Sequence, residues 1–128
     1  MDSDKASSHA KVNDTKRRVF KELTDGGALA WITKGREIEN YVPFDVLQNA
    51  VKQSYSDHYH SPPEQDRYKH ALHFWPIGPN GKRNRKLQTK VDKVRVAKLV
   101  TTVDLDLDVL DLKQYVLELV ARIKEANA

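Results

Sequence analysis

Apolar residues return with a helical period in four stretches of the chain. Such stripes occur in residues 15–23, 44–51, 91–102 and 112–123. Asn13 or Asp14 precedes the first stripe and Asp111 precedes the last, and these residue types cap helix N-termini. Gln114 adds the spacing of a capping box to Asp111, and Pro43 suits the first turn of the second helix. We therefore predict four helices.

Two shorter apolar segments predict strands. Residues 28–32 form an apolar run that turn residues bound on both sides, which indicates a buried strand. Residues 71–77 alternate in polarity, and Pro76 places that strand at an edge. A helix, a short turn and a buried strand make the return half of a βαβ unit, so we expect a parallel partner strand that ends at residues 2–4. The chain starts too late to contain that strand, and we interpret it as a fragment cut or mis-started inside a domain.

Length and composition bound the class of protein. The chain has 128 residues, 39% of them hydrophobic, which suffices for one domain with a modest core. It has no cysteine, so disulfides and thiolate metal sites are excluded. Its apolar runs fall far short of the roughly 20 residues that a membrane span needs. The polar N-terminus does not resemble a signal peptide, and we expect a cytoplasmic protein without a membrane partner.

Two acidic pairs follow the predicted strand ends. Asp2 and Asp4 form the first pair, and Glu37 and Glu39 form the second, just after the strand at residues 28–32. Side chains two residues apart in extended backbone lie on the same side, and Mg²⁺ prefers carboxylate oxygens. In α/β folds, ligands bind beyond the carboxyl ends of parallel strands. The ordinary alternatives are a disordered terminus and a solvated loop.

Basic residues gather in a Gly- and Asn-rich loop, residues 78–90. The formal net charge is +4, and the loop has no acidic residue but five basic ones: Lys82, Arg83, Arg85, Lys86 and Lys90. Such a loop could follow a phosphate backbone, or it could be an ordinary solvated loop. Lys93, at the mouth of the next helix's apolar face, either extends to water or reaches an anionic site. His58 and His60 fit surface histidines better than a metal pair.

Several of these residues together resemble a known family. The Asp-Ser-Asp of residues 2–4 and the Thr-Lys-Gly-Arg-Glu-Ile-Glu-Asn-Tyr of residues 33–41 resemble the TOPRIM nuclease domain of OLD-family (overcoming lysogenization defect) ATP-dependent endonucleases. Residues 92–97, Asp-Lys-Val-Arg-Val-Ala, are similar to the lysine-bearing helix of that family. Residues 110–128 are similar to the C-terminal segment of these proteins. The resemblance covers nearly the whole chain.

The resemblance implies an α/β fold with a partial, Rossmann-like parallel sheet flanked by helices. This sheet would lack its N-terminal strands, and a helical portion would follow it. Residues 1–128 would form the C-terminal portion of one TOPRIM-like domain. Within it, residues 1–53 would hold the strand end, helix, strand, acidic loop and helix. Residues 54–90 would hold a long loop, an edge strand and the basic loop, and residues 91–128 two C-terminal helices.

The resemblance also implies a function, which is hydrolysis of DNA phosphodiesters with two divalent ions, Mg²⁺ or Mn²⁺, in a nuclease with a role in phage defence. By that resemblance Asp2 and Asp4 hold metal, and Glu39, with Glu37 as its alternate, serves the second ion. Lys93 would stabilise charge at the scissile phosphate. Apart from the resemblance, the charge of the basic loop makes its five basic residues candidates for binding nucleic acid, and we add Arg36 to them.

The chain also departs from the family pattern. The family has a further acidic residue before the Asp-x-Asp and an ATPase domain before that, and no Walker motif occurs here. The partners that we expect are DNA and an ATPase domain, which would lie in the same chain or in a separate one. Homo-oligomers would form through the parent protein. We expect low or no activity of the isolated chain, with residual Mg²⁺ affinity. The alternative is a non-catalytic module that binds nucleic acid or docks onto another protein.

Overall fold

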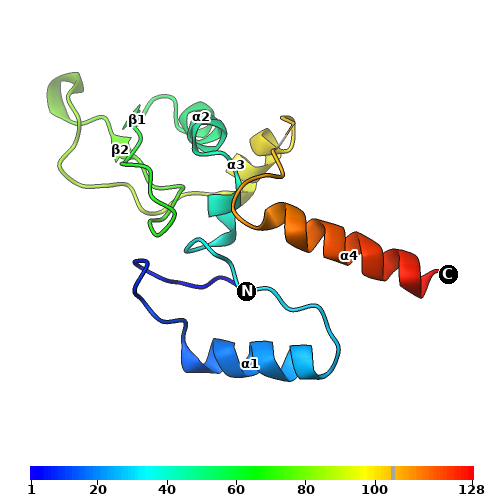
Figure 1. The fold of residues 1–128 in the computed structure, drawn as a ribbon. Helices are drawn as coiled ribbons and strands as arrows, with labels where there is room; N and C mark the ends of the chain where they lie inside the picture. Colours follow the sequence, from blue (N-terminus) through cyan, green and yellow to red (C-terminus); the bar gives the residue numbers. More distant parts are fainter. Residues whose placement is uncertain (105) are drawn as a thin grey trace.

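The described residues form four α-helices and a small antiparallel sheet of two strands. The computed structural model describes residues 1–104 and 106–128 (Figure 1). Along the chain the elements are α1 (Asp14–Asp25), the 3₁₀ turn η1 (Ile38–Tyr41), α2 (Phe44–Ser54), β1 (Tyr59–Ser61), β2 (Trp75–Pro76), the 3₁₀ turn η2 (Pro79–Gly81), α3 (Lys93–Val100) and α4 (Leu112–Ala126). The four predicted helices and the mixed α/β class are confirmed. No helix among the described residues has the length and apolar character that crossing a bilayer would need.

The hydrophobic core lies where α2 packs against α3 and against the loop that leads into β2. Its buried members are Leu47, Ala50, Val51, Ala71, Leu72, Phe74, Val96 and Val100. Phe74, which is 1% exposed, lies between the rings of Tyr55 and Tyr59, at centroid distances of 5.2 and 5.3 Å. The buried Gln48 side chain donates to the carbonyls of Ala71 and His73, so α2 also holds this loop by hydrogen bonds.

The predicted parallel sheet is not present among the described residues. Its intended strand, residues 28–32, has no strand conformation, and the sheet that forms pairs β1 with β2 in antiparallel orientation. The first residues do lie beside residues 31–36 and run in the same direction. The Met1 carbonyl accepts from Thr33 N–H at 3.1 Å, and Asp4 N–H donates to the Arg36 carbonyl at 2.9 Å.

Side-chain hydroxyls explain why these two parallel segments form no ladder. Ser3 N–H donates to the hydroxyl oxygen of Thr33 at 2.9 Å rather than to a carbonyl. The hydroxyls of Ser3 and Thr33 both donate to the Gly35 carbonyl, at 2.6 and 2.9 Å. Because such local bonds replace regular backbone pairing, the strand prediction from apolar run length was wrong here.

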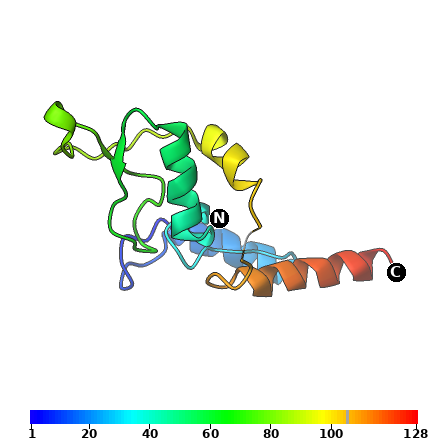
Figure 2. The same ribbon diagram turned by 90° about the horizontal axis from the view of Figure 1, so that it is seen from above.

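The helices α1 and α4 lie outside the core, and neither has a buried residue (Figures 1 and 2). The Asn13 side chain caps α1 by accepting from Thr15 N–H, as predicted. Asp111 does not form the predicted capping box on α4. Its buried carboxylate instead accepts from the hydroxyl of Tyr41. Burial, and after it this hydrogen bond, raise the pKa of Tyr41 well above its usual range.

The start of α4 is held by aromatic packing. Tyr115 stacks on Trp31 with a centroid distance of 4.8 Å and an interplanar angle of 19°. Farther along, Arg122 donates to the Gly27 carbonyl at 2.7 Å. The large apolar side chains of α4 that remain exposed are Leu117, Leu119, Val120 and Ile123.

We predict that Phe74→Ala lowers the free energy of unfolding by about 3 to 5 kcal/mol, because it leaves a cavity between two rings in the core. Urea denaturation followed by circular dichroism measures this change. Ile77→Ala is the matched control, since Ile77 is 41% exposed and its truncation should cost about 1 kcal/mol or less. Equal destabilisation by the two variants would contradict the assignment of the core.

Candidate active site

The turn at residues 35–41 presents the second acidic pair. Glu37 has extended backbone (φ −141°, ψ 166°), and η1 begins immediately after it. Glu37 N–H donates to the side-chain oxygen of Asn40 at 2.9 Å, which closes the turn. A Cβ atom on Gly35 would lie 2.7 Å from Cβ of Asn40 and 3.2 Å from the Arg67 carbonyl oxygen. The turn therefore needs glycine at this position.

Glu37 points into the protein. Its side chain is 10% exposed, and Oε1 accepts from Ala71 N–H at 3.1 Å. Oε2 lies 3.0 Å from Nδ1 of His70. Arg36 N–H also donates to the Arg67 carbonyl at 2.7 Å. These bonds dock the loop of residues 66–73 onto the turn, so the Glu37 carboxylate already has partners within the protein.

Glu39 points the other way and meets Lys93. Its Oε1 lies 2.5 Å from Nζ of Lys93, the first residue of α3. Oε2 is buried and has no hydrogen-bond partner among the described residues. The bond to Glu39 is the largest cause that raises the pKa of Lys93, and the charges of Glu39, Glu37 and Asp2 raise it further. Lys93 is therefore an ammonium ion at neutral pH.

The start of α3 fixes where Lys93 lies. The Asp92 side chain caps the helix by accepting from Arg95 N–H at 3.0 Å. Asp92 N–H donates to the hydroxyl of Tyr55 at 2.8 Å, which ties this cap to the end of α2. The side chain of Lys93 therefore extends from the first residue of α3.

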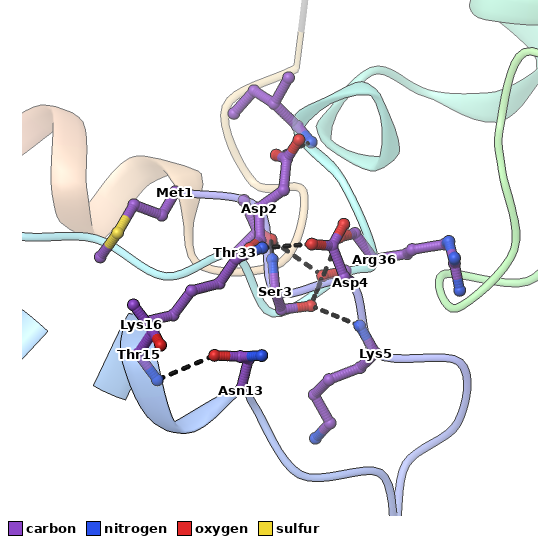
Figure 3. Close-up of polar contacts among 12 residues, drawn as sticks. Met1, Asp2, Ser3, Asp4, Lys5, Asn13, Thr15, Lys16, Thr33 and Arg36 are labelled. Carbon is purple, nitrogen blue, oxygen red and sulfur yellow. Dashed lines mark hydrogen bonds and ion pairs between the residues drawn. The ribbon is translucent and has the colours of Figure 1, made fainter. Parts of the chain in front are cut away.

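Asp2 and Asp4 diverge, contrary to the expectation that they share one side. Asp2 Oδ1 accepts from Ile38 N–H at 2.9 Å, so it lies at the turn that bears Glu39. Asp4 has φ +54°, and its carboxylate pairs with Lys16 of α1 (Figure 3). That hydrogen bond lowers the pKa of Asp4. Lys16 also donates to the Asp2 carbonyl at 2.7 Å, which holds α1 against the N-terminal segment.

Of the site residues that the sequence predicts, Asp2, Glu39 and Lys93 come together from three separate segments. Glu37 instead contacts His70 and Ala71, and Asp4 pairs with Lys16. In the part of the chain that the structure describes, no set of three or more Asp, Glu or His side chains has an arrangement suited to a metal ion. His58 and His60 are both exposed, and Nδ1 of His60 lies 3.0 Å from the Ser61 hydroxyl oxygen.

No pattern in the sequence pointed to His70 and His73. Their rings lie 4.5 Å apart, next to Glu37. Burial, followed by the nearby charge of His70, lowers the pKa of His73. A cavity of about 230 Å³ lies between these residues and α3, with Lys93 and Thr89 in its lining. No spacing in the sequence links a loop histidine to a glutamate 33 residues away.

Arg36 and the basic loop lie in different places. The backbone of Arg36 bonds to Asp4 and Arg67, and its Nε atom is buried with no partner among the described residues. Its side chain extends away from Asp4 in Figure 3. The basic residues 82–90 follow β2 and are separate from this turn.

Comparisons of the chain with protein-family models, with curated proteins and with solved structures gave no match. Function is therefore inferred from the residues, from their arrangement and from the motif resemblance.

We predict that Glu37→Ala lowers the free energy of unfolding by about 1 to 3 kcal/mol, because Ala71 N–H and His70 lose a buried partner. Glu37→Gln should cost less, since its amide oxygen can still accept from Ala71. Urea denaturation at pH 7 measures both. Glu39→Gln is the control, and it should cost at most about 1 kcal/mol because Lys93 is largely exposed. The docking role fails if Glu37→Ala is no less stable than Glu39→Gln.

Proposed function

We propose that this chain carries part of the catalytic centre of a TOPRIM-type, Mg²⁺- or Mn²⁺-dependent DNA endonuclease of the OLD kind. The observation that carries the proposal is the convergence of Glu39, Lys93 and Asp2. Glu39 and Lys93 form a 2.5 Å ion pair, and Asp2 lies at the same turn, close enough for its charge to raise the pKa of Lys93. In metal-assisted phosphodiester hydrolysis, carboxylates can hold the ion and a lysine can offset charge on the phosphate oxygens.

The donor set fits one hard cation. Carboxylate oxygens are the ligands that Mg²⁺ and Mn²⁺ prefer, and the buried Oε2 of Glu39 has no partner among the described residues. Glu39 and Asp2 would hold the ion. Asp4 does not fit as a third ligand in this arrangement, because it pairs with Lys16. A second ion would need one of two further ligands. Either Asp4 would break its ion pair with Lys16, or a carboxylate from outside residues 1–128 would take part.

The residues of this chain have separate tasks in the proposed reaction. Bound Mg²⁺ or Mn²⁺ would supply an activated water and offset charge on the phosphate. Lys93, protonated at neutral pH, places positive charge beside the oxygens that become more negative as the phosphodiester bond breaks. Ile38 N–H orients the carboxylate of Asp2. The cavity next to Lys93 gives an anionic group room to approach.

The complete activity belongs to the parent protein in this proposal. The family resemblance implies an additional acidic residue and an ATPase domain, and neither occurs in residues 1–128. For this chain alone we propose weak binding of one divalent ion and little or no cleavage. That property can be measured without the parent protein.

We predict that Glu39→Gln weakens Mg²⁺ binding by roughly ten-fold or more, because the ion loses a charged ligand. Lys93→Met should instead tighten binding by a few-fold, since the ammonium group no longer competes with the ion for Glu39. Isothermal titration calorimetry with MgCl₂ at low ionic strength measures both. A nuclease ligand set thus predicts opposite signs for these two substitutions.

Glu118→Gln is the matched control, because Glu118 is also ion-paired, with Arg122 on α4 at 3.1 Å. It should leave Mg²⁺ affinity unchanged. The metal role of Glu39 is wrong if Glu39→Gln and Glu118→Gln bind Mg²⁺ equally well, or if the unmodified chain binds none at millimolar concentration. Circular dichroism of each variant shows whether the fold is retained.

A further inference from the structure

The basic loop is a folded hairpin rather than a loose connection. We define the basic hairpin as residues 74–90. At its base, Gln88 N–H donates to the Phe74 carbonyl at 2.9 Å, and farther out Asn84 N–H donates to the Pro76 carbonyl at 2.9 Å. The tip turns through η2, where Asn80 and Gly81 have φ of +59° and +72°. These contacts give the basic side chains a fixed framework.

Its positive charge is not neutralised by carboxylates of the described chain. All five basic side chains are exposed, and none makes an ion pair with a described Asp or Glu: Lys82, Arg83, Arg85, Lys86 and Lys90. No acidic residue occurs between Asp66 and Asp92, and this stretch holds seven basic residues. Because the formal net charge is only +4, the remainder of the chain is net acidic. Five of these seven basic residues lie in the basic hairpin, so positive charge is concentrated there.

The basic residues of helix α1, unlike those of the hairpin, are paired with carboxylates. The helix also has exposed basic residues, but Arg17 pairs with Asp14, Arg18 with Glu22 and Lys21 with Asp25. A high basic content thus occurs at two surfaces, and carboxylates compensate it at only one of them.

The hairpin projects from the body of the molecule. In both ribbon views the segment around residue 80 lies at the outer edge, on the side opposite the C-terminal end of α4 (Figures 1 and 2). An elongated, charged partner can therefore lie along it without meeting α1 or α4.

Trp75 orients one of the cations. The guanidinium of Arg83 lies over the Trp75 ring, 4.6 Å from its centroid. This stacking limits the rotamers of Arg83 while its N–H groups stay exposed. The guanidinium also covers one face of this ring, which belongs to the one tryptophan of the hairpin.

We propose that the basic hairpin binds double-stranded DNA through its phosphate backbone, without reading bases. Unpaired Arg and Lys side chains on a projecting, ordered hairpin suit a dense row of phosphates. A membrane surface fits less well, because Ile77 is the only large apolar side chain of the hairpin that is exposed. The proposal does not depend on catalysis, since it needs neither a metal ion nor Glu39 and Lys93. It would hold even if the nuclease assignment failed.

The test is fluorescence anisotropy with a labelled 20-base-pair duplex in EDTA, over a series of salt concentrations. We expect the logarithm of the binding constant to fall linearly with the logarithm of salt concentration. The triple variant R83Q/R85Q/K86Q should reduce that slope by about 2 to 3, since each lost phosphate contact removes roughly 0.9. Affinity at low salt should fall by about ten-fold or more. Changing the sequence of the duplex should have little effect.

A control variant on α1 distinguishes binding by the basic hairpin from an effect of net charge on DNA affinity. The variant R17Q/R18Q/K21Q removes the same two Arg and one Lys, all exposed, and should leave slope and affinity nearly unchanged. R85Q/K86Q retains the contact of Arg83 with Trp75 and should still lower the slope by about 2, which guards against loss of the hairpin fold.

Three results would overturn the proposal. The first is equal DNA binding by the unmodified chain and by the hairpin variants. The second is an equal loss in the α1 control, which would indicate a response to net charge alone. The third is binding to vesicles that contain phosphatidylserine with no binding to DNA.

Discussion

The backbone of residues 33–37 is the constraint on which the arrangement of this molecule depends. On one side it bonds to the N-terminal segment, through Asp4 N–H to the Arg36 carbonyl and the Ser3 hydroxyl to the Gly35 carbonyl. On the other side Arg36 N–H bonds to the Arg67 carbonyl. This central segment therefore docks the first residues, and together with Gln48 of α2 it holds the loop of residues 66–73. Asp2 comes to the turn that bears Glu39 because the N-terminal segment is hydrogen-bonded along residues 33–38.

These contacts are polar, whereas the apolar core lies elsewhere, between α2, α3 and the segment before β2. Ser3, Thr33 and Glu37 are buried, and a buried polar group without a partner costs about 1 to 3 kcal/mol. Each of these side chains has a partner within hydrogen-bonding distance. Directional bonds therefore set the site geometry, and the core stabilises the element from which Lys93 extends. At this turn, Oε2 of Glu39 and Nε of Arg36 are both buried without a partner among the described residues, and of the two only the carboxylate oxygen can bind a cation.

The sequence predicted the helices well because their apolar stripes are long. It failed for the segment at residues 28–33, where the hydroxyls of Ser3 and Thr33 replace strand pairing, a choice that run length does not encode. For the acidic residues, spacing placed Glu37 and Glu39 directly after the apolar run but could not show that their side chains have different partners. Strand alternation would place both on one side, but η1 begins after Glu37 and rotates Glu39 toward Lys93. His70 lies too far along the sequence for any pattern to connect it with Glu37.

Asp2 and Asp4 also diverge because the backbone leaves the extended conformation at Asp4. Extended backbone would keep them on one side, but Asp4 has φ +54°, a left-handed conformation that aspartate tolerates better than most residues. Its carboxylate then reaches Lys16, which is anchored by the Asp2 carbonyl at the same time. The position of α1 thus decides whether Asp4 faces its neighbour Asp2 or a lysine. Because α1 has no buried residue, few apolar contacts oppose a shift of this helix. A cation that competes with Lys16 for Asp4 would therefore work mainly against one partly exposed ion pair, in which the Asp4 side chain is 64% and the Lys16 side chain 27% exposed, and surface pairs are worth about 1 kcal/mol.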